Sequence, residues 1–70
     1  MATIKVEGNT QQTNNRVEVI LVIQTSKGMI SLPFRFDHQG SALADEKYAF
    51  DELKVLLQES QQALEALGAP

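Results

Sequence analysis

Apolar and polar residues alternate with a period of two along the middle of the chain, a pattern typical of β-strands. This stretch divides into two strands, predicted at about residues 16–25 and 29–37, with a turn between them. A shorter alternation near the amino terminus predicts a first strand at about residues 2–7. The segment 8–15 is wholly polar, with Gly and Asn at its ends, and is therefore expected to be a flexible hairpin loop.

The turn between the second and third strands decides which residues face each other. A two-residue Lys27-Gly28 turn, or a four-residue equivalent, keeps the large apolar residues of both strands on one face, whereas a three-residue turn would mix the faces. The pairs expected for the two-residue turn are Ile23–Leu32, Leu21–Phe34 and Val19–Phe36. Pro33 has no N–H to donate to a ladder, so its strand is expected at an edge and the second strand in the centre.

After the third strand the spacing of apolar residues changes to that of a helix, predicted at about residues 44–67. The helix carries an apolar stripe at heptad positions, which comprises Phe50, Leu53, Leu57, Leu64 and Leu67 and is widened by Ala49, Leu56 and Ala63. Tyr48 and Val55 lie off this stripe and are expected to face solvent. The stripe is therefore expected to pack on the sheet.

Ser41 or Asp45 can cap the start of the helix, and Gly68 followed by Pro70 marks its end. The elements together predict an α+β fold, in which a three-stranded antiparallel β-meander is followed by one long C-terminal α-helix packed on one face (βββα). A chain of this length is expected to form a single domain over residues 1–70.

Two surfaces are expected to remain apolar after the core has formed. The second face of the sheet carries Ile20, Val22, Met29 and Pro33. The helix spans roughly 34 Å, against about 26 Å for a strand of about eight residues, so Leu64 and Leu67 are expected to overhang the sheet. These six residues form the predicted interface with a second subunit or another protein.

Composition restricts the remaining possibilities. A domain of 70 residues buries only about 60% of its unfolded surface, so a second subunit would add stability. The absence of Cys excludes disulfides and thiolate chemistry, and a net charge of −3 makes nucleic acid an unlikely ligand. No run of about 18 apolar residues is present, and the expectation is a cytoplasmic protein with no membrane segment.

Candidate catalytic chemistry is sparse. His38 is the sole histidine and lies next to Asp37, with Ser41 nearby, but neighbours in sequence rarely form a catalytic triad. A histidine that makes hydrogen bonds near the start of the helix is the preferred interpretation. Metal binding by His38 with Asp37, Asp45 or Glu46 is not favoured, because the ligand spacing matches no defined site. No catalytic residue, cofactor or metal is therefore predicted.

The sequence predicts a small non-enzymatic protein-interaction module that forms a homodimer and binds an unknown protein partner through the sheet face or the helix end. Two alternatives remain open. The first is a small acidic inhibitor that mimics nucleic acid, which fits the acidic helix. The second is a weak nucleic-acid-binding domain of the same βββα topology.

Overall fold

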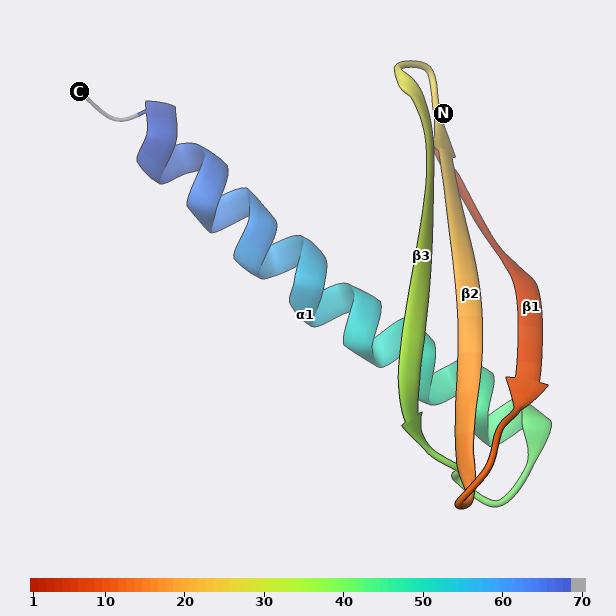
Figure 1. Cartoon of the computed structure of the whole chain (residues 1–70). Coiled ribbons are helices and arrows are strands. Elements are labelled where there is room, and N and C mark those ends of the chain that lie inside the picture. Colours follow the sequence, from red (N-terminus) through yellow and green to blue (C-terminus); the bar gives the residue numbers. More distant parts are fainter. Residues whose placement is uncertain (69–70) are drawn as a thin grey trace.

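The computed structural model describes residues 1–68, which form a three-stranded antiparallel sheet followed by one helix (Figure 1). The elements are β1 (Thr3–Gln11), β2 (Arg16–Thr25), β3 (Gly28–Asp37) and α1 (Ala42–Gly68). β2 lies in the centre of the sheet, so β3, which contains Pro33, is an edge strand as predicted. The predicted βββα class is confirmed; Pro70, expected to follow the end of the helix, lies outside the described residues.

β1 is longer than the alternation of apolar residues predicts. The strand continues to Gln11, so the prediction of a loop over residues 8–15 is wrong for its first half. The connection that remains is a tight turn, in which Asn14 and Asn15 have φ values of 60° and 58°. Asn tolerates this left-handed conformation better than most residues, which explains the Asn-Asn pair at this position.

A β-bulge in the middle of β1 reverses its alternation. The pairing with β2 jumps from Val6 opposite Leu21 to Gly8 opposite Ile20, which leaves one extra residue in β1. Beyond the bulge, Asn9 therefore lies on the same side of the sheet as Val6, the side that faces the helix. A polar residue thus reaches the start of α1 from a strand that a strict alternation would have turned the other way.

The turn between β2 and β3 consists of Ser26 and Lys27, one residue earlier than predicted. Leu21 consequently lies opposite Leu32 rather than Phe34, a shift of two residues from the predicted register. The observed pairs on the helix-facing side are Ile23–Ile30, Leu21–Leu32, Val19–Phe34 and Val17–Phe36. Because a shift of two residues leaves every side chain on its original face, the faces were predicted correctly although the partners were not.

Gly28 provides a backbone conformation that this hairpin needs, but it is the first residue of β3 and not a residue of the turn. Its φ of 146° lies in a region that other residues rarely adopt. The Thr25 hydroxyl closes the turn, since it accepts the Lys27 N–H at 3.1 Å and donates to the Gly28 carbonyl at 3.2 Å.

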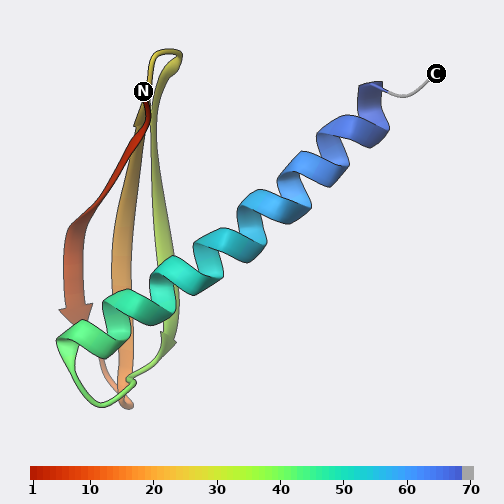
Figure 2. The ribbon, with the colours of Figure 1, turned by 180° about the vertical axis from the view of Figure 1, so that it is seen from behind.

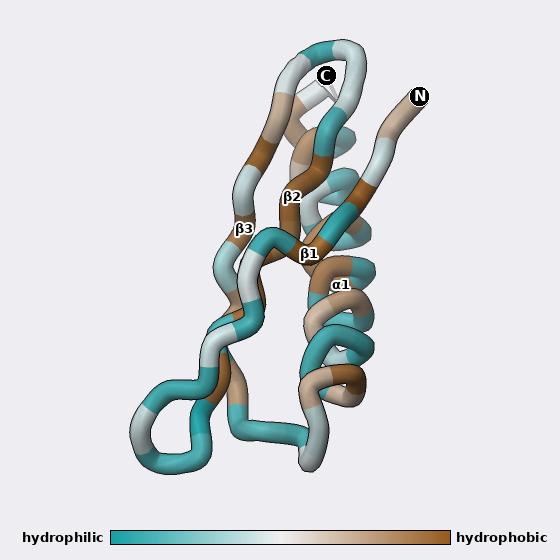
Figure 3. The backbone as a smooth tube through the Cα atoms, turned by 90° about the vertical axis from the view of Figure 1, so that its right-hand side faces the viewer, coloured by the Kyte–Doolittle hydropathy of each residue, from teal (hydrophilic) through white to brown (hydrophobic). Residues whose placement is uncertain are grey.

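The core lies between one face of the sheet and the first half of α1, which form two layers (Figure 3). Its buried residues are Val17, Val19, Leu21, Ile23 and Phe36 from the sheet and Ala49 and Leu53 from the helix, with Val6, Leu32, Phe34 and Leu56 partly buried around them. Tyr48 was expected to face solvent and is 37% exposed, and its ring also packs against that of Phe36 with 4.5 Å between the centroids. Val55 is half exposed, as expected.

α1 crosses only one end of the sheet and then leaves it (Figures 1 and 2). The helix has 27 residues and is about 40 Å long. Leu56 is its last residue packed against the core, and residues 57–68, here called the overhang, continue beyond it. The predicted overhang with exposed Leu64 and Leu67 is confirmed, although it begins earlier along the helix than expected.

The opposite end of the sheet, near the β2–β3 turn, has no helix over it (Figure 2). This hairpin end comprises residues 3–6 and 22–31. Ile4 and Ile30 lie there on the helix-facing side and are both about half exposed. Within residues 1–68, no helix is both long enough and apolar enough to cross a membrane.

Candidate functional site

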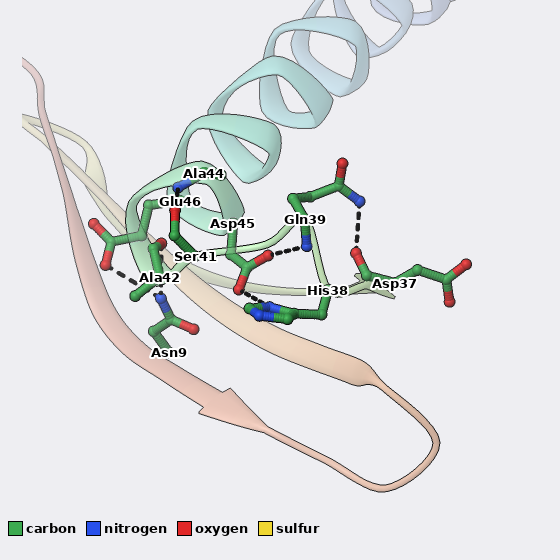
Figure 4. Close-up of polar contacts among 9 residues, drawn as sticks. All are labelled: Asn9, Asp37, His38, Gln39, Ser41, Ala42, Ala44, Asp45 and Glu46. Carbon is green, nitrogen blue, oxygen red and sulfur yellow. Dashed lines mark hydrogen bonds and ion pairs between the residues drawn. The ribbon is translucent and has the colours of Figure 1, made fainter.

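A cluster of polar side chains surrounds the start of α1 (Figure 4). Asn9 comes from β1, His38 and Ser41 from the connection between β3 and α1, and Asp45 and Glu46 from the first turns of the helix. These residues line a cleft of about 440 Å³ together with Gln11, Val17 and Ala42. Its lining is mostly polar.

Asp45 is the centre of the cluster and is only 1% exposed. Its Oδ2 lies 2.7 Å from Nδ1 of His38, and its Oδ1 accepts the backbone N–H of Gln39 at 2.6 Å. An ionised carboxylate only accepts hydrogen bonds, so this contact requires the His38 tautomer that has a proton on Nδ1 when Asp45 is ionised. The position of Asp45 near the amino-terminal end of the helix dipole also favours its negative charge. The carboxylate therefore holds the β3–α1 connection against the helix.

Two further contacts fix the start of the helix. The Ser41 hydroxyl accepts the Ala44 N–H at 3.1 Å, which makes Ser41 the N-cap. Asp45, the other predicted cap, instead holds the β3–α1 connection against the helix. The Asn9 side-chain amide donates to the Ala42 carbonyl and to Oε2 of Glu46, both at 3.2 Å. The bulge in β1 therefore places Asn9 where its side chain joins the sheet to the helix.

The structure does not bring the sequence neighbours Asp37, His38 and Ser41 together as a triad. Asp37 pairs with Arg16 at 3.1 Å, while His38 turns to Asp45 and Ser41 to the helix backbone. The expectation that His38 makes a hydrogen bond near the helix start is confirmed. Within residues 1–68, no three His, Asp or Glu side chains come close enough to hold a metal ion.

We expect Asp45→Ala to lower the free energy of unfolding by about 2–3 kcal/mol, because the Gln39 N–H and the His38 ring lose a shared acceptor in a partly buried place. Urea unfolding followed by circular dichroism measures the change. Asp51→Ala is the matched control, since Asp51 makes only an exposed ion pair with Lys54 at 3.7 Å and should change stability by about 0.5 kcal/mol or less. Equal midpoints for the two variants would show that the cluster does not stabilise the fold.

The apolar residues predicted on the second face of the sheet differ in what they offer a partner. Val22 is only 2% exposed, and Ile20 is partly buried. Gly8 lies directly beside Ile20, and a Cβ there would be 3.6 Å from its Cδ1. Met29 and Pro33 are exposed. This face therefore has less free apolar surface than the sequence suggests.

The helix has more exposed apolar surface than this face of the sheet. Leu43, Phe50, Leu57 and Leu64 recur at intervals of seven along one flank of the helix and are all exposed; they are here called the apolar row. Leu43 is 79% exposed and Leu64 is 67% exposed, while Leu67 on the neighbouring flank is 83% exposed. The prediction that the heptad stripe packs on the sheet is therefore wrong for Phe50 and Leu57, which are exposed. Leu43, Ile4 and Ile30 were not among the predicted interface residues. The row could have been found in the sequence from the interval of seven residues between its members.

A groove of about 360 Å³ lies at the amino-terminal end of the apolar row. Its lining includes Leu43, Glu46, Lys47 and Phe50, which are positions i, i+3, i+4 and i+7 of the helix. Four residues with this spacing form the hole that receives a side chain from a second helix in coiled coils. The groove therefore has the residue spacing of such a hole.

Comparison of the chain with protein-family models, with curated proteins and with solved structures gave no significant match.

Proposed function

We propose that this chain is a small non-catalytic protein-interaction module that works as a homodimer. The interface consists of the apolar row of α1 and the hairpin end of the sheet. The observation that carries this proposal is the large apolar surface that one chain leaves uncovered on both elements. The polar groups near the helix start cap the helix and join it to the sheet. These structural contacts support a non-catalytic role.

The exposed area of the chain supports association. The solvent-accessible surface area of this chain is 5336 Å², whereas that of a compact monomer of the same mass is roughly 4,300 Å². The excess, about 1,000 Å², is comparable to the ~800 Å² that each partner contributes to a standard protein interface. The radius of gyration is 14.0 Å, against about 11 Å for a compact domain of this length. A second subunit would restore a normal ratio of surface to mass.

The overhang gives a second reason for a partner. Helices in proteins gain most of their stability from packing of their apolar face, and an isolated helix shorter than about 12–15 residues is marginal in water. The overhang has no sheet beneath it, yet it carries Leu57, Leu64 and Leu67 on one side. A second helix or sheet against that side would supply the missing contacts.

The decisive test of dimerisation is light scattering after size exclusion, at several protein concentrations. We expect the mass of a dimer at micromolar concentrations and above, with an apparent mass that falls only on strong dilution. Measurement in high salt separates apolar from ionic association, because apolar contacts persist when charges are screened. A monomer at every concentration would refute the proposed function.

A further inference from the structure

We propose that the two copies pack their helices antiparallel, so that the overhang of each copy covers the hairpin end of the other copy's sheet. This inference rests on the proposed homodimer and specifies its geometry. It follows from the direction in which the apolar row points, from the spacing of the row and from the distribution of charge.

The apolar row lies on the flank of α1 that faces the uncovered part of the sheet. Tyr48 and Phe50 are two residues apart, and at about 100° per residue they lie on opposite flanks of the helix. Tyr48 packs against Phe36, which lies at the end of β3 next to the helix start. The flank of Phe50 must therefore be directed toward the other end of the sheet, where the β2–β3 turn lies (Figure 1). A helix placed beside the row would lie over the hairpin end.

The row is also complementary to itself in the antiparallel direction. Its four residues are evenly spaced, so a twofold axis near Leu53 and Lys54 brings Leu43 of one copy within about a turn of the partner's Leu64. The same axis brings Phe50 near the partner's Leu57. The groove beside Leu43 and Phe50 then receives a leucine from the partner's overhang.

Charge favours the antiparallel direction over the parallel one. The overhang carries Glu59 and Glu65 and no basic residue, whereas the hairpin end carries Lys27 in its turn and no acidic residue. Lys5 lies opposite Val22, on the face of the sheet turned away from the helix. An antiparallel pair brings each acidic overhang to a basic hairpin end. A parallel pair would place the two acidic overhangs side by side and would leave both hairpin ends uncovered.

The antiparallel geometry also explains why the apolar arc of α1 is wider than its own sheet requires. In the first half of the helix, Ala49 and Leu53 contact the chain's own sheet. In the overhang, Ala63 and Leu67 continue the same flank of the helix, and they would contact the sheet of the partner. The apolar row fills the space between the two helices. Each helix thus contacts two sheets and one helix.

Cysteine crosslinking tests the direction, and the chain has no cysteine of its own. Leu43 and Leu64 are exposed, so Leu43→Cys and Leu64→Cys should leave the fold of each chain intact. With a short bis-maleimide crosslinker, we expect the double variant to form a covalent dimer, while neither single variant does. Within one helix the two positions are roughly 31 Å apart, so the double variant cannot be bridged internally.

The matched control is the double variant Leu43→Cys/Ala66→Cys, because Ala66 lies at nearly the same height as Leu64 but on the opposite side of the helix; it should stay uncrosslinked. A second pair, Lys47→Cys with Gln61→Cys, repeats the test with substitutions outside the apolar row. Crosslinking of the single variants would show parallel helices and overturn the inference. A dimer by light scattering in which neither pair crosslinks would also overturn it, while leaving the proposed homodimer intact.

Discussion

Leu21→Ala is expected to lower the free energy of unfolding by about 2–5 kcal/mol, because it opens a cavity where the surrounding side chains cannot close in completely. Leu21 is fully buried at the centre of β2, opposite Val6 on one side and Leu32 on the other. A domain of this size rarely has more than about 3–5 kcal/mol of stability from its core. A large fraction of the variant should therefore be unfolded without denaturant.

Urea unfolding at a fixed protein concentration measures this loss, since the stability of a dimer depends on concentration. Val55→Ala is the control, because Val55 is half exposed on a flank of the helix away from both the core and the apolar row. It should change the free energy of unfolding by about 0.5 kcal/mol or less. A Leu21→Ala protein as stable as this control would contradict the assignment of the core.

Leu64→Glu is expected to weaken the dimer by roughly 100-fold or more, while the fold of each chain is retained. Each dimer contains two copies of the substitution, and each copy forfeits about 1.5–3 kcal/mol of apolar burial and brings a carboxylate into the interface. The fold should survive, because Leu64 is 67% exposed and makes no contact with the core. Light scattering gives the mass and circular dichroism checks the fold.

Two comparisons make the Leu64→Glu experiment specific. Val55→Glu introduces the same charge on the opposite flank of α1 and should leave the dimer intact. Ile20→Glu tests the other predicted surface, the second face of the sheet, and should have a smaller effect on association than Leu64→Glu. If Ile20→Glu alone dissociated the dimer, the interface would lie on that face, and the helix-based geometry would be wrong.

Most of the fold could be predicted from local patterns. The period of two in β2 and β3 identifies the strands and the face that they bury. The heptad spacing in α1 identifies the helix but not the part of its stripe that the sheet covers, since Leu57, Leu64 and Leu67 are exposed. Ser41 was one of two predicted caps, and it is the residue that caps. These features depend on backbone geometry over a few residues, which is why one sequence suffices to predict them.

The register and the bulge could not be predicted in this way. Alternation specifies the face of a side chain but does not distinguish registers that differ by two residues, so Leu21 was assigned to Phe34 instead of Leu32. The bulge in β1 has no signal in the hydrophobic pattern, because Gly8 and Asn9 lie in a polar stretch. Pairing with β2 extends β1 through this stretch.

The candidate site shows the same limit. Asp37 and His38 are adjacent in sequence, but Asp37 ends a strand, where successive side chains point to opposite faces. Asp37 therefore contacts Arg16, and His38 contacts Asp45, seven residues away. Only the path of the chain between β3 and α1 brings the second pair together.

The sequence determined the types of the elements, their order and the faces that β2 and β3 bury, because these follow from the periodicity of strands and helices. Tertiary structure alone decided the angle at which α1 crosses the sheet. That angle arises from packing of Ala49, Leu53 and Leu56 against one end of the sheet, and no local pattern encodes it. It leaves the apolar row and the hairpin end uncovered on the same side, and this shared uncovered surface is what a second copy would fill.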